Sequence, residues 1–224
     1  PYILALIIPC SISFFIAERS KIKREYLIYF AVFAIFGLFV AVVSTYFPDY
    51  SAAKILAQKQ LDFISMVNAS NSGSKFEIPI LDDSLFSLIK NSPTALLNSF
   101  LRPWIWESKV WPQTLAAIEN IIIICTTFVL MLKFRISKVE HRNVALFALF
   151  FSILLFILVG LITPNMGALV RYKSIGLPFF FIMLVSGYSI YNINGKSKKI
   201  NALIARIKKH INQVIWQDEN NDLI

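Results

Sequence analysis

The sequence predicts an all-α membrane protein: a polytopic bundle of transmembrane helices with a helical segment outside the membrane. Of the 224 residues, 57% are hydrophobic and 16% are charged, which is too apolar for an ordinary water-soluble domain with a single core. The apolar residues are also gathered into long runs. About 20 residues of helix cross a hydrocarbon layer of about 30 Å, so these runs predict helices that span a membrane.

Five apolar runs have the length expected of a transmembrane helix: residues 1–17, 26–47, 114–132, 144–162 and 174–193. The first run lacks the basic leader and the small-residue cleavage site of a signal peptide, so we interpret it as a span. Because Pro1 opens directly into this run, we expect the chain to be the C-terminal part of a longer protein.

Basic residues predict the direction in which these helices cross the membrane. Lys and Arg are concentrated in 18–25, 133–142 and 194–224, and connections of this kind are retained in the cytoplasm. The two other connections, 48–113 and 163–173, then lie outside, and we expect the protein in a bacterial inner membrane. The formal net charge of +9 follows from this topology, so no nucleic-acid partner is predicted.

The longer outer connection, 48–113, is predicted to be helical. It carries six basic and six acidic residues, and it is not polar enough for a disordered linker. Apolar residues recur at helical spacing within 51–67, and 68–75 is rich in Asn, Ser and Gly, which ends that helix. A second helix is predicted from Leu85, and Pro93 is interpreted as the first-turn residue of a separate third helix.

Two further patterns predict contact with the membrane surface. Trp104, Trp106 and Trp111 precede the run 114–132, and tryptophan rings prefer the headgroup zone. In 194–224, apolar residues recur every three or four positions among Lys and Arg, which predicts a cytoplasmic amphipathic helix on the anionic inner leaflet. A helix that docks a protein partner is the alternative.

The histidines and cysteines do not predict a metal site or a bound cofactor. Cys10 and Cys125 lie within apolar runs and have no partner at metal-ligand spacing. His141 and His210 lie among basic residues on the predicted cytoplasmic side, where we interpret them as solvated surface residues. The sequence also lacks a glycine-rich loop with the lysine that cradles a nucleotide phosphate.

Six residues on the predicted outer side are candidates for a functional site: Arg102, Glu107, Glu119, Asn165, Arg171 and Lys173. Basic residues are normally depleted on this side, so Arg171 and Lys173 are expected to face an anion. That anion is Glu107 or Glu119, or the phosphate of a lipid-linked substrate, which arginine binds through two parallel hydrogen bonds. Ordinary phospholipid headgroups are the alternative ligand.

The acidic candidates and the asparagine have their own expected roles. Glu119 lies five residues into the third predicted span, about 7–8 Å from its start at a rise of about 1.5 Å per residue. A carboxylate at that depth is unfavourable unless it is paired, protonated or facing a wet cavity. Glu107 and Glu119 are therefore the candidate catalytic residues, and Asn165 is expected to hydrogen-bond a sugar or to cap its turn.

Four short segments resemble known proteins: 102–107, 116–120, 165–167 and 170–173. Through these segments, the stretch from about 91 to 193 resembles a family of bacterial polytopic membrane proteins grouped with envelope polysaccharide machinery. It is similar to O-antigen polymerases and membrane glycosyltransferases. The resemblance implies an action on polyprenyl-phosphate-linked sugars at the outer side of the inner membrane, and it assigns no catalytic residue.

Three hypotheses for the function follow. In the first, the protein is an envelope glycan polymerase or transferase: Arg102, Arg171 and Lys173 hold the diphosphate of a lipid carrier, and Glu107 or Glu119 orients them or acts as a base. In the second, the same residues form the outer gate of a transporter or flippase. In the third, the outer helices dock a partner in a non-enzymatic assembly. The sequence leaves open whether the protein is an enzyme, which sugar it binds and its oligomeric state.

Overall fold

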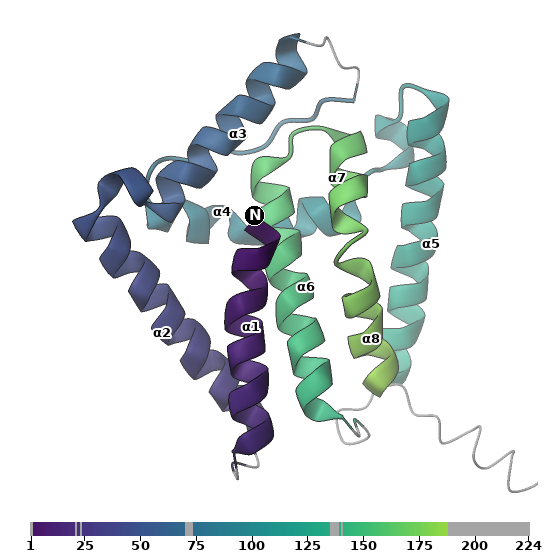
Figure 1. Cartoon of the computed structure of the whole chain (residues 1–224). Coiled ribbons are helices and arrows are strands. Elements are labelled where there is room, and N and C mark those ends of the chain that lie inside the picture. Colours follow the sequence, from purple (N-terminus) through teal and green to yellow (C-terminus); the bar gives the residue numbers. More distant parts are fainter. Residues whose placement is uncertain are drawn as a thin grey trace, which may run out of the picture. The chain divides into compact units, whose positions relative to one another are not determined.

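The computed structural model describes residues 2–20, 22, 24–69, 74–134, 139 and 141–187, with side chains omitted for 2–4 and 133. This part of the chain contains eight α-helices (Figure 1): α1 Tyr2–Arg19, α2 Glu25–Tyr46, α3 Ala52–Ala69, α4 Leu85–Leu101, α5 Trp111–Lys133, α6 Arg142–Ile162, α7 Met166–Lys173 and α8 Leu177–Gly187. Two short 3-10 turns, η1 Pro48–Tyr50 and η2 Ile105–Glu107, precede α3 and α5. The all-α prediction is confirmed here, and the predicted helix within 194–224 lies outside the described residues.

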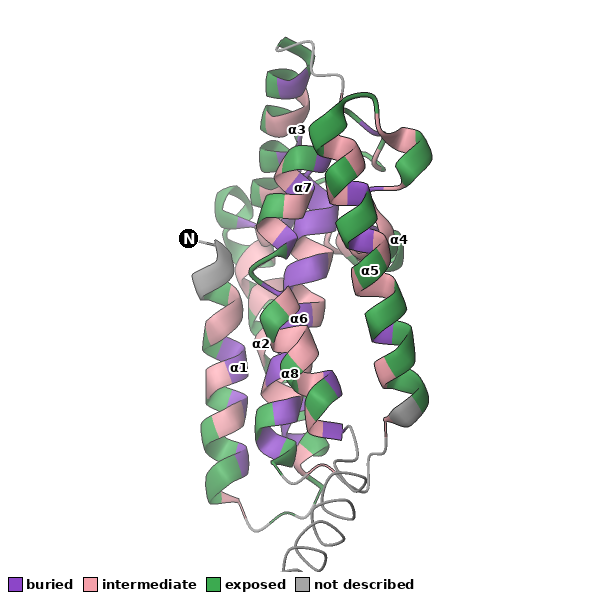
Figure 2. Ribbon diagram, turned by 90° about the vertical axis from the view of Figure 1, so that its right-hand side faces the viewer, coloured by how far each residue is buried: buried purple, intermediate pink, exposed green. Residues whose placement is uncertain are grey.

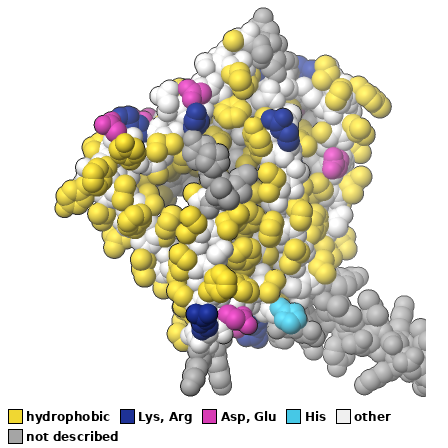
Figure 3. Space-filling view, viewed as in Figure 1, with side chains coloured by type: hydrophobic (Ala, Val, Ile, Leu, Met, Phe, Trp, Pro, Cys, Tyr) yellow, Lys and Arg dark blue, Asp and Glu magenta, His cyan; other side chains and the backbone are white. Residues whose placement is uncertain are grey.

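Long apolar helices and an apolar surface indicate a membrane protein. Helices α2, α5 and α6 are each long and apolar enough to cross a membrane, and α7 with α8, bent by 49°, add a fourth element if the pair is one span. Hydrophobic side chains cover the middle of the surface, and charged ones gather toward its two ends (Figure 3). Large side chains such as Phe39 and Phe128 are more than half exposed, which suits contact with lipid.

The two ends of the bundle differ in the residues they carry. The C-terminal ends of α1 and α5 and the N-terminal ends of α2 and α6 lie at the same end of the bundle (Figure 1), and we call it the basic end because Arg19, Arg24 and Arg142 are there. The opposite end carries α3, α7 and the link from α4 to α5 (Figure 1). We call it the site end, since all six candidate residues belong to segments that meet there.

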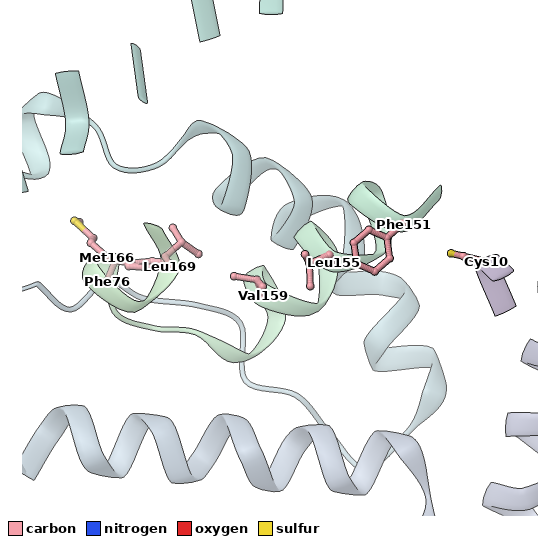
Figure 4. Packing of buried hydrophobic residues seen from close by; sticks show 7 residues of the cluster. All are labelled: Cys10, Phe76, Phe151, Leu155, Val159, Met166 and Leu169. Carbon is pink, nitrogen blue, oxygen red and sulfur yellow. The ribbon is translucent and has the colours of Figure 1, made fainter. Parts of the chain in front are cut away.

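Helix α6 is the central helix of the bundle and packs against α1, α4 and α8. Buried residues follow its length, whereas much of α5 is exposed (Figure 2). A hydrophobic cluster beside α6 draws its buried members from α1, the stretch after α3, α6 and α7 (Figure 4): Cys10, Phe76, Phe151, Leu155, Val159, Met166 and Leu169. About half of the apolar stretch of α6 is buried inside the protein, and a helix that packs against several neighbours is apolar over much of its surface.

The predicted apolar runs 1–17, 26–47, 114–132 and 144–162 coincide with α1, α2, α5 and α6 to within three residues at each end. The run predicted from 174 is different, because a turn at 174–176 precedes α8. The connection 163–173 contains α7, which the sequence did not lead us to expect. Asn165 starts this helix by accepting hydrogen bonds from the N–H groups of Gly167 and Ala168, donors that a helix start otherwise leaves unpaired.

The prediction of two helices separated at Pro93 is wrong, because α4 continues through that residue. Proline removes one N–H from the helical ladder, but packing compensates this loss. Ser87, Ala95 and Ser99 form a buried stripe of small residues, and α4 lies across α6 (Figure 1). Small residues allow two helix backbones to approach closely, so tertiary contact holds α4 as a single helix.

Gln60 of α3 joins three segments at the site end. Its side chain is fully buried, and Nε2 donates to the carbonyl oxygens of Leu161 at 2.7 Å and Pro79 at 2.9 Å. Its Oε1 accepts from the N–H of Leu81 at 2.8 Å. Leu161 is in the last turn of α6, where carbonyl groups lack helical partners. Gln60 therefore fastens α3 and the stretch before α4 to the end of the central helix.

Replacing Gln60 with leucine is expected to lower the free energy of unfolding by about 2–4 kcal/mol, because each polar group left without a partner costs about 1–3 kcal/mol. The matched control is Gln58→Leu, two residues earlier on the same helix, where the exposed side chain bonds only to Asp62. That control is expected to change stability by less than about 0.5 kcal/mol. Unfolding of the purified protein in detergent measures both, and equal stabilities of the two variants contradict the role of Gln60.

Candidate functional site

Arg102 and Glu107 form an ion pair in the link between α4 and α5. Arg102 directly follows α4, and Glu107 is the last residue of η2. Nη2 of Arg102 lies 3.3 Å from Oε1 of Glu107, and 23% and 19% of the two side chains are exposed. A partly buried pair of this kind is less screened by water than a surface pair. The two candidate residues of this link therefore face each other.

Phe76 packs against the guanidinium of the same arginine. The distance from Arg102 Cζ to the ring centre is 4.5 Å, within the range in which a cation is attracted to an aromatic face. Backbone hydrogen bonds hold this stretch beside the start of α7: Phe76 donates to Pro164 at 3.0 Å, and Met166 donates to Ser74 at 3.0 Å. A residue that sequence reasoning did not select thus positions Arg102.

One terminal nitrogen of the Arg102 guanidinium is without a hydrogen-bond acceptor. Nη1 is buried and has no hydrogen-bond partner among the described residues. Buried donors are almost always paired, and an unpaired one costs free energy. An acceptor oxygen supplied by a ligand is the expected partner for such a group, and arginine is suited to phosphate oxygens because its donors are planar and parallel.

Lys173, at the end of α7, is buried and bonded to neutral protein groups. Only 3% of the residue is exposed. Its Nζ donates to the carbonyl oxygen of Arg102 at 2.7 Å and to Oδ1 of Asn120 at 2.5 Å. Asn120 of α5 in turn donates from Nδ2 to the carbonyl oxygen of Leu101 at 2.7 Å. We call Lys173 and Asn120 the clamp, because together they hold the backbone from which Arg102 projects.

Glu119 lies next to the clamp in sequence but has a different environment. Its side chain is exposed on α5, and its charge interacts favourably with that of Lys173. Of the two acids expected to compensate Arg171 and Lys173, Glu119 acts on Lys173, whereas Glu107 pairs with Arg102 instead. A buried ammonium needs such compensation, since removing a charge from water costs several kcal/mol.

Arg171 is separated from the other cations by the geometry of α7. Residues two positions apart on an α-helix point about 200° apart, so Arg171 and Lys173 face nearly opposite sides. Arg171 is exposed, and its Nη2 donates to the hydroxyl of Tyr172 at 3.2 Å. The sequence hypothesis placed Arg171 and Lys173 on one phosphate. The structure points Lys173 inward and Arg171 outward, and it uses Asn165 as the helix cap.

Two residues of this site were missed in the sequence, Asn120 and Phe76. Asn120 had a usable signal, because it is a strongly polar side chain within an apolar run, and such residues face the bundle interior. Phe76 had no such signal in the sequence, because its contact with Arg102 depends on an isolated antiparallel bridge between Lys75 and Asn165. That bridge joins positions 90 residues apart in the sequence, and no local pattern predicts it.

The aromatic residues beside Glu107 add an exposed flat surface. Trp104 and Trp106 stack with ring centres 4.8 Å apart and planes inclined by 10°, and 76% of Trp106 is exposed. The site thus combines an arginine with a free donor, a carboxylate and an accessible indole face. Among the residues that the structure describes, no group of three His, Cys, Asp or Glu side chains is placed to hold a metal ion.

Comparison with known proteins adds no relative to this description. No protein-family model, curated protein or solved structure matches the chain.

Proposed function

We propose that the protein is a multi-pass protein of a bacterial inner membrane with five spans: α1, α2, α5, α6 and the bent pair α7–α8. The arrangement of the basic residues supports this topology, because the helix ends that flank the basic links 18–25 and 133–142 lie at one end of the bundle (Figure 1), and positively charged links stay in the cytoplasm. In this proposal the basic end is cytoplasmic, and 48–113 and 163–173 face the outside. The C-terminal tail is cytoplasmic.

The proposed function is in envelope polysaccharide synthesis, with a polyprenyl-diphosphate-linked sugar bound at the site end. The observation that carries this proposal is the unsatisfied Nη1 of Arg102, a buried donor on a residue type that prefers phosphate. The resemblance of 91–193 to O-antigen polymerases and membrane glycosyltransferases supports the same substrate class. An isoprenoid chain would lie along the apolar middle of the molecule, which is visible on the face shown in Figure 3.

Each residue of the site has a defined part in this proposal. Arg102 binds the diphosphate and stabilises the charge that develops on it as the glycosidic bond breaks. Glu107 and Phe76 orient the guanidinium, and the exposed face of Trp106 receives a sugar ring. Glu119 is exposed and forms no ion pair within 4 Å among the described residues, so it is the candidate base. In this reading the protein is a polymerase or a glycosyltransferase.

One observation favours a second candidate function, transport of the lipid-linked sugar across the membrane. Transporters commonly bind substrate where a membrane helix is interrupted, and α7 and α8 meet at a bend of 49°. Lys173 lies at that interruption. In this alternative the same Arg102 binds the diphosphate at an outer gate, and no glycosidic bond forms or breaks.

Arg102→Ala is expected to reduce activity about 100-fold, the usual effect of removing one donor that stabilises a developing negative charge. Arg102→Lys keeps the charge but loses the planar pair of donors, so it is expected to recover only part of the activity. The readout is surface polysaccharide in cells that depend on this protein, at equal protein level in the membrane. Lys109→Ala, an exposed cation of the same link, is the matched control and is expected to be neutral.

A vesicle assay separates the two candidate functions. The purified protein is reconstituted with a labelled polyprenyl-diphosphate sugar, and glycan length and sidedness of the label are followed. Lengthening of the glycan supports the enzyme, and translocation without lengthening supports the transporter. Wild-type polysaccharide in cells that carry Arg102→Ala contradicts both, because each requires the guanidinium to bind the diphosphate.

A further inference from the structure

A second candidate binding site lies at the basic end of the bundle, opposite to the site end. It is a half-open cavity of about 440 Å³ between α2, α6 and α8. Its inner wall is apolar and includes Leu146, Leu149 and Met183. Its polar lining comes from Arg24, Glu25 and Arg142. This volume is within the ~300–1,000 Å³ of sites that bind small molecules.

The start of α6 adds positive potential to this cavity. Glu25 and Arg142, which line it, are the first residues of α2 and α6, and neither helix has a side-chain cap. The first turn of α6 contains no acidic residue. The acceptor oxygen of Asn143, the second residue of α6, is already occupied by the hydroxyl of Tyr29 at 2.8 Å. Unpaired N–H groups at a helix start attract anions, and the two arginines strengthen that attraction.

Glu25, in contrast to the two arginines, needs a hydrogen-bond donor. Its Oε2 is buried and has no hydrogen-bond partner among the described residues. A buried carboxylate oxygen without a donor costs free energy, more than a neutral acceptor does. The cavity therefore joins one buried acceptor that lacks a donor, Oε2 of Glu25, to two exposed arginines that favour an anion.

The surroundings of the cavity indicate a membrane lipid as the occupant. Tyr26, Leu27 and Val144, which flank the starts of α2 and α6, are 43–47% exposed, and exposed apolar residues here face hydrocarbon. A small soluble anion would satisfy the arginines but leave the apolar wall and Glu25 without partners. A phospholipid headgroup that joins a phosphate to an ammonium by a two-carbon bridge provides both polar groups, and its acyl chain fits the wall.

We propose that this cavity binds one molecule of phosphatidylethanolamine from the surrounding leaflet. The phosphate lies between Arg24 and Arg142 at the start of α6, and the ammonium donates to Oε2 of Glu25. One acyl chain follows Leu149 and Met183 into the cavity. Because this ligand satisfies the buried carboxylate, phosphatidylethanolamine is retained in preference to phosphatidylglycerol, whose headgroup carries no cation.

The test is lipid mass spectrometry on the full chain, purified in a mild detergent from membranes that contain both phospholipids. Wild type is expected to retain about one phosphatidylethanolamine per chain, and the double variant Arg24→Gln/Arg142→Gln at least fivefold less. Arg19→Gln is the matched control. It removes an arginine at the same end, beside a shallow groove formed by Phe15, Ile16 and Ser20, and is expected to retain lipid as wild type does.

Glu25→Gln distinguishes this lipid from a general preference for phosphate. It keeps the shape of the side chain but removes its charge, so lipid is still retained while the preference for phosphatidylethanolamine over phosphatidylglycerol disappears. Equal retention by wild type and the double arginine variant overturns the proposal. So does displacement of the bound lipid by millimolar inorganic phosphate, which assigns the two arginines to a soluble anion.

Discussion

Gly160→Ala is expected to destabilise the protein by about 3 kcal/mol or more, at or above the upper end of the usual effect of overpacking. A Cβ atom added at Gly160 would lie 2.0 Å from the carbonyl oxygen of Ala95. That oxygen belongs to the backbone of α4, so a side-chain rotation cannot relieve the overlap and the whole helix must move. The stripe of small residues on α4 would then lose its close contact with α6.

Gly37→Ala is the matched control for this variant. Gly37 also lies inside an apolar helix, α2, but nothing lies within 4 Å of a Cβ added there. Alanine has the higher helix propensity, by about 1 kcal/mol, so this change is expected to be neutral or slightly stabilising. Thermal unfolding in detergent, followed by circular dichroism and by size-exclusion chromatography, measures both variants. A Gly160→Ala protein as stable as Gly37→Ala contradicts the close α4–α6 packing.

Asn120→Leu is expected to lower the free energy of unfolding by about 3–5 kcal/mol, the usual effect of removing one partner from a buried charge. The ammonium of Lys173 would keep the carbonyl of Arg102 but lose Oδ1 of Asn120. The carbonyl of Leu101 would lose its donor as well. Thr126→Leu, at an exposed position on the same helix, is the matched control and is expected to be close to neutral.

A second substitution tests whether the charge of Lys173 causes this loss. Lys173→Met removes the ammonium together with its hydrogen bonds, so no buried charge is left uncompensated. In the background of Asn120→Leu it is expected to restore part of the lost stability, giving a double variant more stable than Asn120→Leu alone. If the two losses simply add, the side chains are energetically independent and the clamp is not a unit.

The helices were largely predictable from the sequence because the signal for each is local. A run such as 144–162 shows its length and apolarity within itself, and α6 follows it closely. Helix α4 was not predictable in one piece. Pro93 is a strong local signal for a helix start, and only the distant residue Gly160 explains why the helix passes through it. Tertiary packing overrode local preference at that position.

The candidate site was likewise predictable where its contacts are local in the sequence, and not where they join distant segments. Arg102 and Glu107 are close in sequence, and their pairing could be anticipated from that link alone. The inward position of Lys173 could not, because its partner Asn120 comes from another helix 53 residues away. Two basic residues in one short segment suggested a shared ligand. Because this segment forms helix α7, Arg171 and Lys173 point to opposite sides. The sequence did not predict that helix, so it wrongly placed the two residues together.

The bend after α7 connects the clamp directly to helix α8. The carbonyl oxygen of Lys173 accepts the N–H of Gly176 at 2.9 Å, so the residue whose ammonium is gripped is also the pivot from which α8 departs. Helix α8 packs against α6 and α5, so a change in how Lys173 is held would shift the start of α8 against both of these helices.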